Sequence, residues 1–163
     1  MVSGRLGCPV CDRTYDVVDG VARFDTPPST GAADSVLSAA AAEALVGLSG
    51  PGGFVVVVGV SGVLGRGLAD RLEGVHLVSV NPVDAPRETP SISILEGRTI
   101  PLKTRSVRGV VLAPGYASEA QWLEEARRVV LPGLRVVGEG PDPALDGIEI
   151  IASAGGVWVG VTS

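Results

Sequence analysis

Residues 54–67 decide the fold of this chain, and they read FVVVVGVSGVLGRG. The four consecutive valines form a β-branched apolar run, which is typical of a strand buried on both faces, as in a parallel sheet. Gly59, Gly62 and Gly65 follow it and allow a tight turn whose backbone approaches a ligand closely before a helix begins. This strand, turn and helix predict an α/β protein that holds a nucleotide-like cofactor at the turn.

Strands and helices alternate on either side of this stretch. An alanine-rich helix capped by Asp34 is expected to run to about Leu48. A capping box formed by Ser118 and Gln121 predicts another helix, to about residue 130. A third helix is expected at 64–73, and the expected strands are 54–58, 75–80, 92–95, 107–112, 134–138, 147–152 and 157–162. This order predicts an open, mostly parallel sheet that ends in an antiparallel hairpin.

Three segments are expected along the chain. Residues 1–26 predict a small β-hairpin with its turn at Asp19 and Gly20. Residues 27–49 predict a linker and a helix, and residues 50–163 the main α/β domain. A chain of 163 residues with 45% hydrophobic residues is long and apolar enough to bury one core.

The composition restricts the partners of the protein. A formal net charge of −5 and only six aromatic residues among 163 disfavour nucleic-acid binding, which needs a positive surface and stacking side chains. The apolar stretches are shorter than the roughly 18 uncharged residues of a membrane span, and the N-terminus lacks a signal-peptide core. We therefore predict a soluble, cytoplasmic protein that binds a small molecule or a protein partner. A homo-oligomer, paired through a sheet edge or the N-terminal hairpin, is left open.

Several segments resemble one known family. Residues 124–137, EEARRVVLPGLRVV, are similar to the helix, Leu-Pro-Gly turn and fifth strand of class I S-adenosylmethionine-dependent methyltransferases. Residues 100–111 resemble the approach of that family to its fourth strand. Residues 148–160, IEIIASAGGVWVG, resemble the closing strands of its small-molecule group. The resemblance covers most of the chain and implies a Rossmann-like methyltransferase fold.

The resemblance also implies a cofactor site with a degenerate motif. S-adenosylmethionine would lie against Gly59, Ser61 and Gly62, its ribose near Asn81 and its adenine near Glu96. Asn81 stands where the family has an acidic residue that accepts both ribose hydroxyls, and a neutral amide there weakens binding by roughly 1 kcal/mol.

Two further departures lie at the turn itself. Val57 replaces the acidic residue that ends the first strand of the family, and Ser61 and Val63 replace two of its glycines. Tyr116 lies where the family places substrate-facing groups. Three departures in one pocket predict weakened or lost cofactor binding.

Three functions remain open from the sequence. The first is a methyltransferase-like pseudoenzyme that acts as a binding or regulatory module, and the second is an active small-molecule methyltransferase. The third is a protein related to short-chain dehydrogenases, because the spacing of Gly59, Gly62 and Gly65 also suits the pyrophosphate of NAD(P). The Tyr-x-x-x-Lys pair of such enzymes is missing, since Lys103 is the only lysine. The glycines are also compatible with a tight connection that binds nothing.

A second candidate site lies near the N-terminus. Cys8 and Cys11 have the spacing of half a zinc site, and their Cys-Pro-Val-Cys segment is similar to the zinc-ribbon-like domain fused to, or partnering, some methyltransferases. The only histidine, His76, is expected at a strand edge. A closed metal site would need carboxylates or a second molecule. Reduced structural cysteines, a redox pair and a disulfide are the alternatives.

Overall fold

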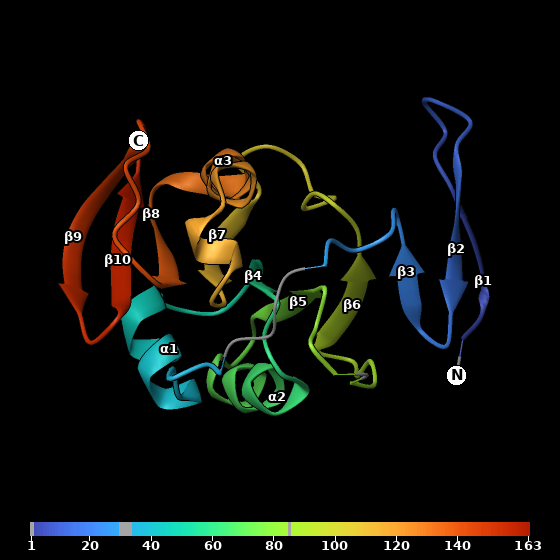
Figure 1. Ribbon diagram of the computed structural model, residues 1–163. Coiled ribbons are helices and arrows are strands. Elements are labelled where there is room, and N and C mark those ends of the chain that lie inside the picture. Colours follow the sequence, from blue (N-terminus) through green and yellow to red (C-terminus); the bar gives the residue numbers. More distant parts are fainter. Residues whose placement is uncertain (1, 30–33, 85) are drawn as a thin grey trace.

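The computed structural model describes residues 2–29, 34–84 and 86–163, and their strands form one ten-stranded sheet (Figure 1). The order of the strands across the sheet is β1-β2-β3-β6-β5-β4-β7-β8-β10-β9. Their bounds are β1 Gly4–Gly7, β2 Thr14–Val18, β3 Val21–Arg23, β4 Phe54–Val58, β5 His76–Val80, β6 Ile92–Glu96, β7 Val107–Leu112, β8 Val130–Glu139, β9 Ile148–Ala154 and β10 Val157–Thr162.

The centre of the sheet is parallel. Strands β6, β5, β4, β7 and β8 pair in parallel, with Val56 of β4 in register with Val78 of β5 and Val110 of β7. Strand β10 returns antiparallel between β8 and β9, through a turn at Gly155 and Gly156. The predicted fold class is confirmed: an α/β protein with a mostly parallel sheet and an antiparallel C-terminal hairpin.

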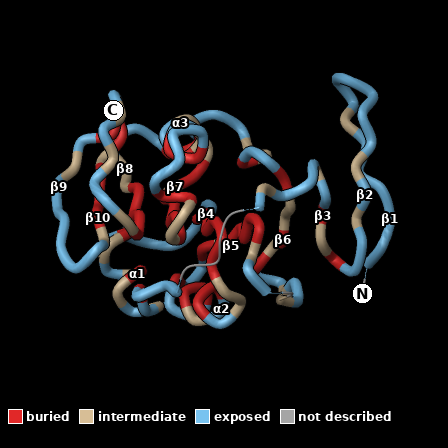
Figure 2. The backbone as a smooth tube through the Cα atoms, viewed as in Figure 1, coloured by how far each residue is buried: buried red, intermediate tan, exposed pale blue. Residues whose placement is uncertain are grey.

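Helices cover both faces of the central strands. Helices α1 (Ala39–Val46) and α2 (Gly62–Arg71) lie on one face, and α3 (Ala120–Val129) lies on the other (Figure 1). The valines of residues 55–58 are fully buried between these layers, as two-sided coverage of a parallel sheet requires (Figure 2). Among the described residues, no helix is long and apolar enough to cross a membrane.

The N-terminal strands extend this sheet. Strands β2 and β3 form the predicted hairpin, with Asp19 and Gly20 in the left-handed region at its turn. Strand β1 adds a third antiparallel strand outside β2. Strand β3 pairs in parallel with β6, so the backbone hydrogen bonding runs from the hairpin into the main domain.

Two expected helix starts are wrong. Helix α1 begins at Ala39 and is capped by Ser38, whose hydroxyl accepts the N–H of Ala41 (3.1 Å), so Asp34 does not cap it. Residues 35–37 stay outside the helix because they bind a buried carboxylate, described below. Helix α3 begins at Ala120, after the 3-10 turn Tyr116–Ser118, and the hydroxyl of Ser118 donates to the carbonyl of Gly115 instead of capping α3.

Candidate functional site

The predicted cofactor positions lie at the edge where the parallel strands end. The N–H of Gly59, after β4, donates to the carbonyl of Val80 (2.9 Å), and that of Ala113, after β7, donates to Val58 (3.0 Å). Asn81 follows β5 at the same edge. In open α/β sheets this carboxyl edge is where ligands bind. The structure thus brings the turn at Gly59 and the predicted ribose position, Asn81, together.

The turn at Gly59 is covered by Tyr116. Gly59 has a left-handed φ of 70°, and a methyl group at its Cα would overlap the Tyr116 ring. Tyr116 is only 5% exposed and packs edge-to-face on Trp122, with ring centroids 5.0 Å apart. The ring of the predicted substrate-facing residue therefore lies directly on the turn, where the resemblance implies the methionine portion of the cofactor.

The start of helix α2 is occupied by a carboxylate. Ser61 is the N-cap, and its hydroxyl accepts the N–H of Leu64 (3.2 Å). The N–H of Gly62 points out of the helix and donates to both oxygens of Asp84, at 2.8 and 3.1 Å. Free N–H groups at a helix N-terminus form an anion site. Here Asp84 is the anion.

Asn81 is engaged within the fold. Its side-chain amide donates to the carbonyl of Gly97 (2.7 Å), and its side-chain oxygen accepts the N–H of the same residue (2.9 Å). The residue is 6% exposed and adopts a left-handed φ of 49°, which asparagine tolerates well. This pair of bonds extends the pairing of β5 with β6 by one step and leaves the amide little capacity for a ribose.

Glu96 lies at the last position of β6 and faces the N-terminal strands. Its carboxylate pairs with Arg23 of β3 (3.2 Å), its partner in the strand register. The two side chains line a cavity of about 290 Å³ between the N-terminal strands and the segment after β5, together with Val18, Asp19, Val21, Pro82, Asp84, Pro86, Arg87 and Ile94. The predicted adenine-facing residue is thus ion-paired at the junction of the N-terminal strands.

A buried carboxylate that the sequence analysis missed lies at the end of β8. Glu139 is 2% exposed and accepts three hydrogen bonds from one segment: the hydroxyl of Ser35 (2.6 Å), the N–H of Val36 (2.7 Å) and the N–H of Leu37 (3.1 Å). The segment therefore covers the carboxyl end of β8. Neither Glu139 nor Asp84 stands in a motif, and their partners lie about a hundred and about twenty residues away, so the sequence carries no signal for either contact.

The two cysteines lie in the connection between β1 and β2, which β3 and β6 separate from β5 in the order of the sheet. Cys11 is exposed and Cys8 is partly exposed. The pKa of the Cys8 thiol is lowered, first by the N–H of Val10 and then by the thiol and the N–H of Cys11. Among the described residues, no group of three or more His, Cys, Asp or Glu side chains could hold a metal ion. Cys8 and Cys11 therefore provide two ligands at most.

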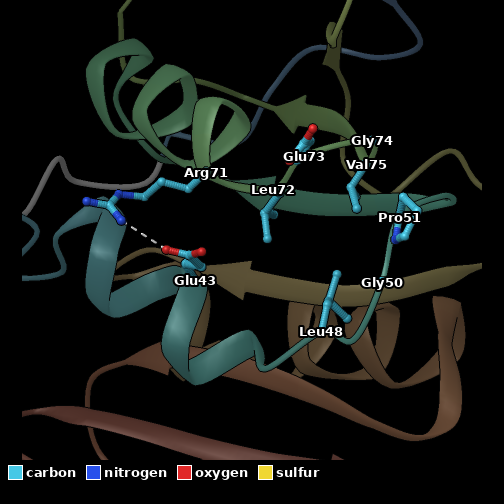
Figure 3. A pocket seen from close by; sticks show the side chains of 9 residues that line it. All are labelled: Glu43, Leu48, Gly50, Pro51, Arg71, Leu72, Glu73, Gly74 and Val75. Atoms are coloured by element: carbon cyan, nitrogen blue, oxygen red, sulfur yellow. Dashed lines mark hydrogen bonds and ion pairs between the residues drawn. The ribbon is translucent and has the colours of Figure 1, made fainter.

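Another cavity lies at the opposite ends of the strands, where β4 and β5 begin. It has a volume of about 570 Å³ and opens beside the amino ends of β4 and β5, where Arg71 and Glu43 form an ion pair (3.0 Å) across it (Figure 3). The other lining residues are Leu48, Gly50, Pro51, Leu72, Glu73, Gly74 and Val75. Its size does not make it the better candidate, because parallel sheets bind ligands at the carboxyl edge and its arginine is already paired.

The comparisons with known proteins establish the fold. No protein-family model and no curated protein sequence matches the chain. Among solved structures, the antibiotic-resistance methyltransferase Kmr is 17% identical with a TM-score of 0.53, over 82% of this chain and 96% of that one. A SAM-dependent methyltransferase from Aquifex aeolicus is 17% identical with a TM-score of 0.51, over 69% of this chain and 82% of that one.

A third structure is much longer than this chain. The geranyl diphosphate C-methyltransferase from Streptomyces coelicolor A3(2), solved with Mg²⁺, geranyl-S-thiolodiphosphate and S-adenosyl-L-homocysteine, is 16% identical with a TM-score of 0.52. The match covers 61% of this chain but only 41% of that enzyme, so this chain spans less than half of it. The chain has the fold of the class I S-adenosylmethionine-dependent methyltransferases.

Proposed function

We propose that this protein is a methyltransferase-fold pseudoenzyme, in which its own side chains close the cofactor edge, and that it acts as a binding or regulatory module. The observation that carries the proposal is the occupation of three implied cofactor positions from within the chain. The Tyr116 ring covers Gly59, the Asp84 carboxylate binds Gly62, and the Asn81 amide is paired with Gly97.

The energetics of these contacts oppose ligand entry. A cofactor lying on Gly59 must first expose the Tyr116 ring, and exposing a buried aromatic side chain costs roughly 2 kcal/mol. It must also displace the exposed Asp84 carboxylate from the Gly62 N–H, which costs about 0.5–1 kcal/mol because water can solvate both groups. A carboxylate at that position repels the carboxylate of S-adenosylmethionine. It repels the pyrophosphate of NAD(P) for the same reason, which disfavours the dehydrogenase-like alternative.

A second candidate, an active small-molecule methyltransferase, is favoured by the backbone of the turn. Gly59 keeps a left-handed conformation and Ser61 keeps the helix cap, so the geometry that admits a cofactor survives beneath Tyr116. Tyr116 belongs to a 3-10 turn of three residues, Tyr116–Ser118, and displacement of this short element would uncover Gly59. The structural neighbours, among them an enzyme solved with S-adenosyl-L-homocysteine, support this candidate at the level of the fold.

Calorimetric titration of the full chain separates the candidates. Wild type is titrated with S-adenosylmethionine, S-adenosylhomocysteine, NAD and NADP, beside Tyr116→Ala, which uncovers Gly59. The pseudoenzyme proposal expects no heat of binding from wild type. Micromolar binding of S-adenosylmethionine to wild type would overturn it in favour of the active enzyme, and binding of a dinucleotide would favour the third alternative. Binding only by Tyr116→Ala would identify the Tyr116 ring as the group that closes the edge.

A further inference from the structure

The connection between β1 and β2 is a tight knuckle built around the two cysteines. The N–H of Cys8 donates to the carbonyl of Arg13 (2.8 Å), and the N–H of Asp12 donates to the carbonyl of Cys8 (3.1 Å). Asp12 adopts a left-handed φ of 53°, which turns the chain back toward β2. Both cysteines lie on this turn, and neither forms a disulfide. The backbone therefore places the two cysteines on one tight turn before any ligand arrives.

The residue types and the spacing of the knuckle suit a metal. Cys8 and Cys11 are both free cysteines, and two residues separate them on one tight turn. Thiolate is the ligand form of cysteine. Soft thiolate ligands at this spacing select zinc-class divalent ions.

The chain supplies only half of such a site. A structural zinc site of thiolates is tetrahedral, with four protein ligands. The sequence contains two cysteines and one histidine. That histidine, His76, lies in β5, where its ring hydrogen-bonds to Ser93 (2.8 Å). Within the described ranges no third ligand joins the pair. Two coordination positions must therefore be filled from another molecule.

The position of the knuckle suits a second molecule. The β1–β2 arm projects from the body of the protein, with the knuckle at its tip (Figure 1). All four residues of β1 are exposed, and Val10, between the cysteines, is 92% exposed. An apolar side chain this exposed gains from burial against a matching surface.

We infer that Cys8 and Cys11 form half of a tetrathiolate site for a zinc-class divalent ion, and that a second copy of the chain supplies the other half. Two identical knuckles related by a two-fold axis give four sulfur ligands and bring the two Val10 side chains together. Binding releases the thiol protons to solvent, so metal affinity rises with pH. The inference does not depend on the proposed loss of cofactor binding.

The test is a metal titration of the full, reduced, metal-free chain with Zn²⁺, and with Co²⁺ as a spectroscopic probe. The expected result is one metal ion per two chains, with thiolate-to-cobalt charge-transfer absorption. Light scattering should show a doubling of mass on metal addition, reversed by a chelator. Cys8→Ser and Cys11→Ser should each abolish both signals. Both positions are at the exposed tip, and circular dichroism checks that the variants fold. His76→Ala is the matched control and should retain both signals.

Three results would overturn the inference. The first is one metal ion per chain at unchanged mass, which would mean that ligands outside the two knuckles complete the site. The second is loss of binding in His76→Ala, which would make the histidine a ligand. The third is no metal uptake by the reduced chain, which would leave the cysteines as a thiol pair without a metal.

Discussion

Replacing Asn81 with aspartate tests directly whether this residue faces a ligand or serves the fold. The resemblance to methyltransferases implies that an acid here strengthens ribose binding. The structure predicts the opposite outcome. The side-chain amide donates to the carbonyl of Gly97 at 2.7 Å, and aspartate replaces that donor with an oxygen that faces another oxygen. The change is isosteric, and aspartate also tolerates the left-handed backbone, so the effect isolates the lost donor.

The loss of folding stability expected for Asn81→Asp has two parts and an upper limit. Loss of the hydrogen bond costs about 1 kcal/mol, and the buried carbonyl left facing a carboxylate adds about 1–3 kcal/mol, for a total of roughly 2–4 kcal/mol. Protonation of the new Asp restores a donor, at a cost of about 1.4 kcal/mol for each pH unit above its unfolded pKa of about 3.9. The penalty therefore cannot exceed about 4 kcal/mol at pH 7 or about 1.5 kcal/mol at pH 5.

The ionisation of the new carboxyl also determines how the loss of stability depends on pH. Burial opposite a carbonyl raises the pKa of the new carboxyl above its unfolded value. The folded state therefore favours the neutral form of the new carboxyl. The loss of stability caused by Asn81→Asp is full above the pKa of this carboxyl in the folded state, and it disappears as the pH falls below its pKa in the unfolded state. Urea unfolding at pH 7 and pH 5 measures the free energy of unfolding of Asn81→Asp and wild type. The difference between them should shrink at pH 5.

Gln121 offers a matched control. Its side-chain amide also donates to a backbone carbonyl, that of Arg98, but at an exposed position. Gln121→Glu makes the same chemical change where water solvates the new charge, so it should cost less than about 1 kcal/mol, with little difference between the two pH values. If Asn81→Asp unfolds like wild type and binds S-adenosylmethionine more tightly in calorimetry, Asn81 faces a working cofactor pocket and the argument from Gly97 is wrong.

Three other substitutions test contacts elsewhere. Burial raises the pKa of Glu125, but hydrogen bonds from Arg128 and a backbone N–H bring it below its ordinary value of 4.5. The ionised Glu125 therefore stabilises the folded protein fully above about pH 4.5, and this contribution is lost at lower pH. Glu125→Gln should reduce the fall in the free energy of unfolding between pH 6 and pH 3, measured by urea unfolding. Gly138→Ala places a methyl group against the buried indole of Trp158 and should lower the free energy of unfolding by about 1–3 kcal/mol, with a changed near-UV circular dichroism spectrum. Glu139→Ala leaves two backbone N–H groups without their carboxylate and should cost roughly 2–4 kcal/mol, with faster hydrogen exchange of both amides; unchanged exchange would show that the segment is held by other contacts.

The sequence predicts the strands well where a local pattern is sufficient. The valine run gives β4 as residues 54–58, and β7 and β10 also match their expected bounds. A β-branched run buried on both faces needs no long-range information to be recognised. The predicted helix starts are wrong because they depend on long-range contacts. Asp34 is a good cap by residue type, but the carboxylate of Glu139 binds residues 35–37 and keeps them outside the helix, and that contact spans about a hundred residues of sequence.

The candidate site also has a part that the sequence predicts and a part that it does not. Gly59 and Asn81 could be placed at one edge from the sequence, because each follows a strand of a parallel sheet. The groups that contact these two residues could not be predicted from the sequence. Asp84 lies in a segment without secondary structure, and Gly97 gives no signal beyond its flexibility. Tyr116 was expected at this edge, but whether its ring faces a substrate or the turn depends on packing against Trp122.

The proposed closure of the edge also serves the fold. The start of helix α2 has an N–H donor that needs a partner, and the turn has a glycine that a neighbouring side chain can cover. Asp84 satisfies the donor at Gly62, and the Tyr116 ring covers Gly59. The resemblance implies that Asn81 stands in place of an acid, and its amide is paired with Gly97 at the same edge. Partners from within the chain at all three positions are what the proposed pseudoenzyme requires, because its edge has to be stable without a cofactor.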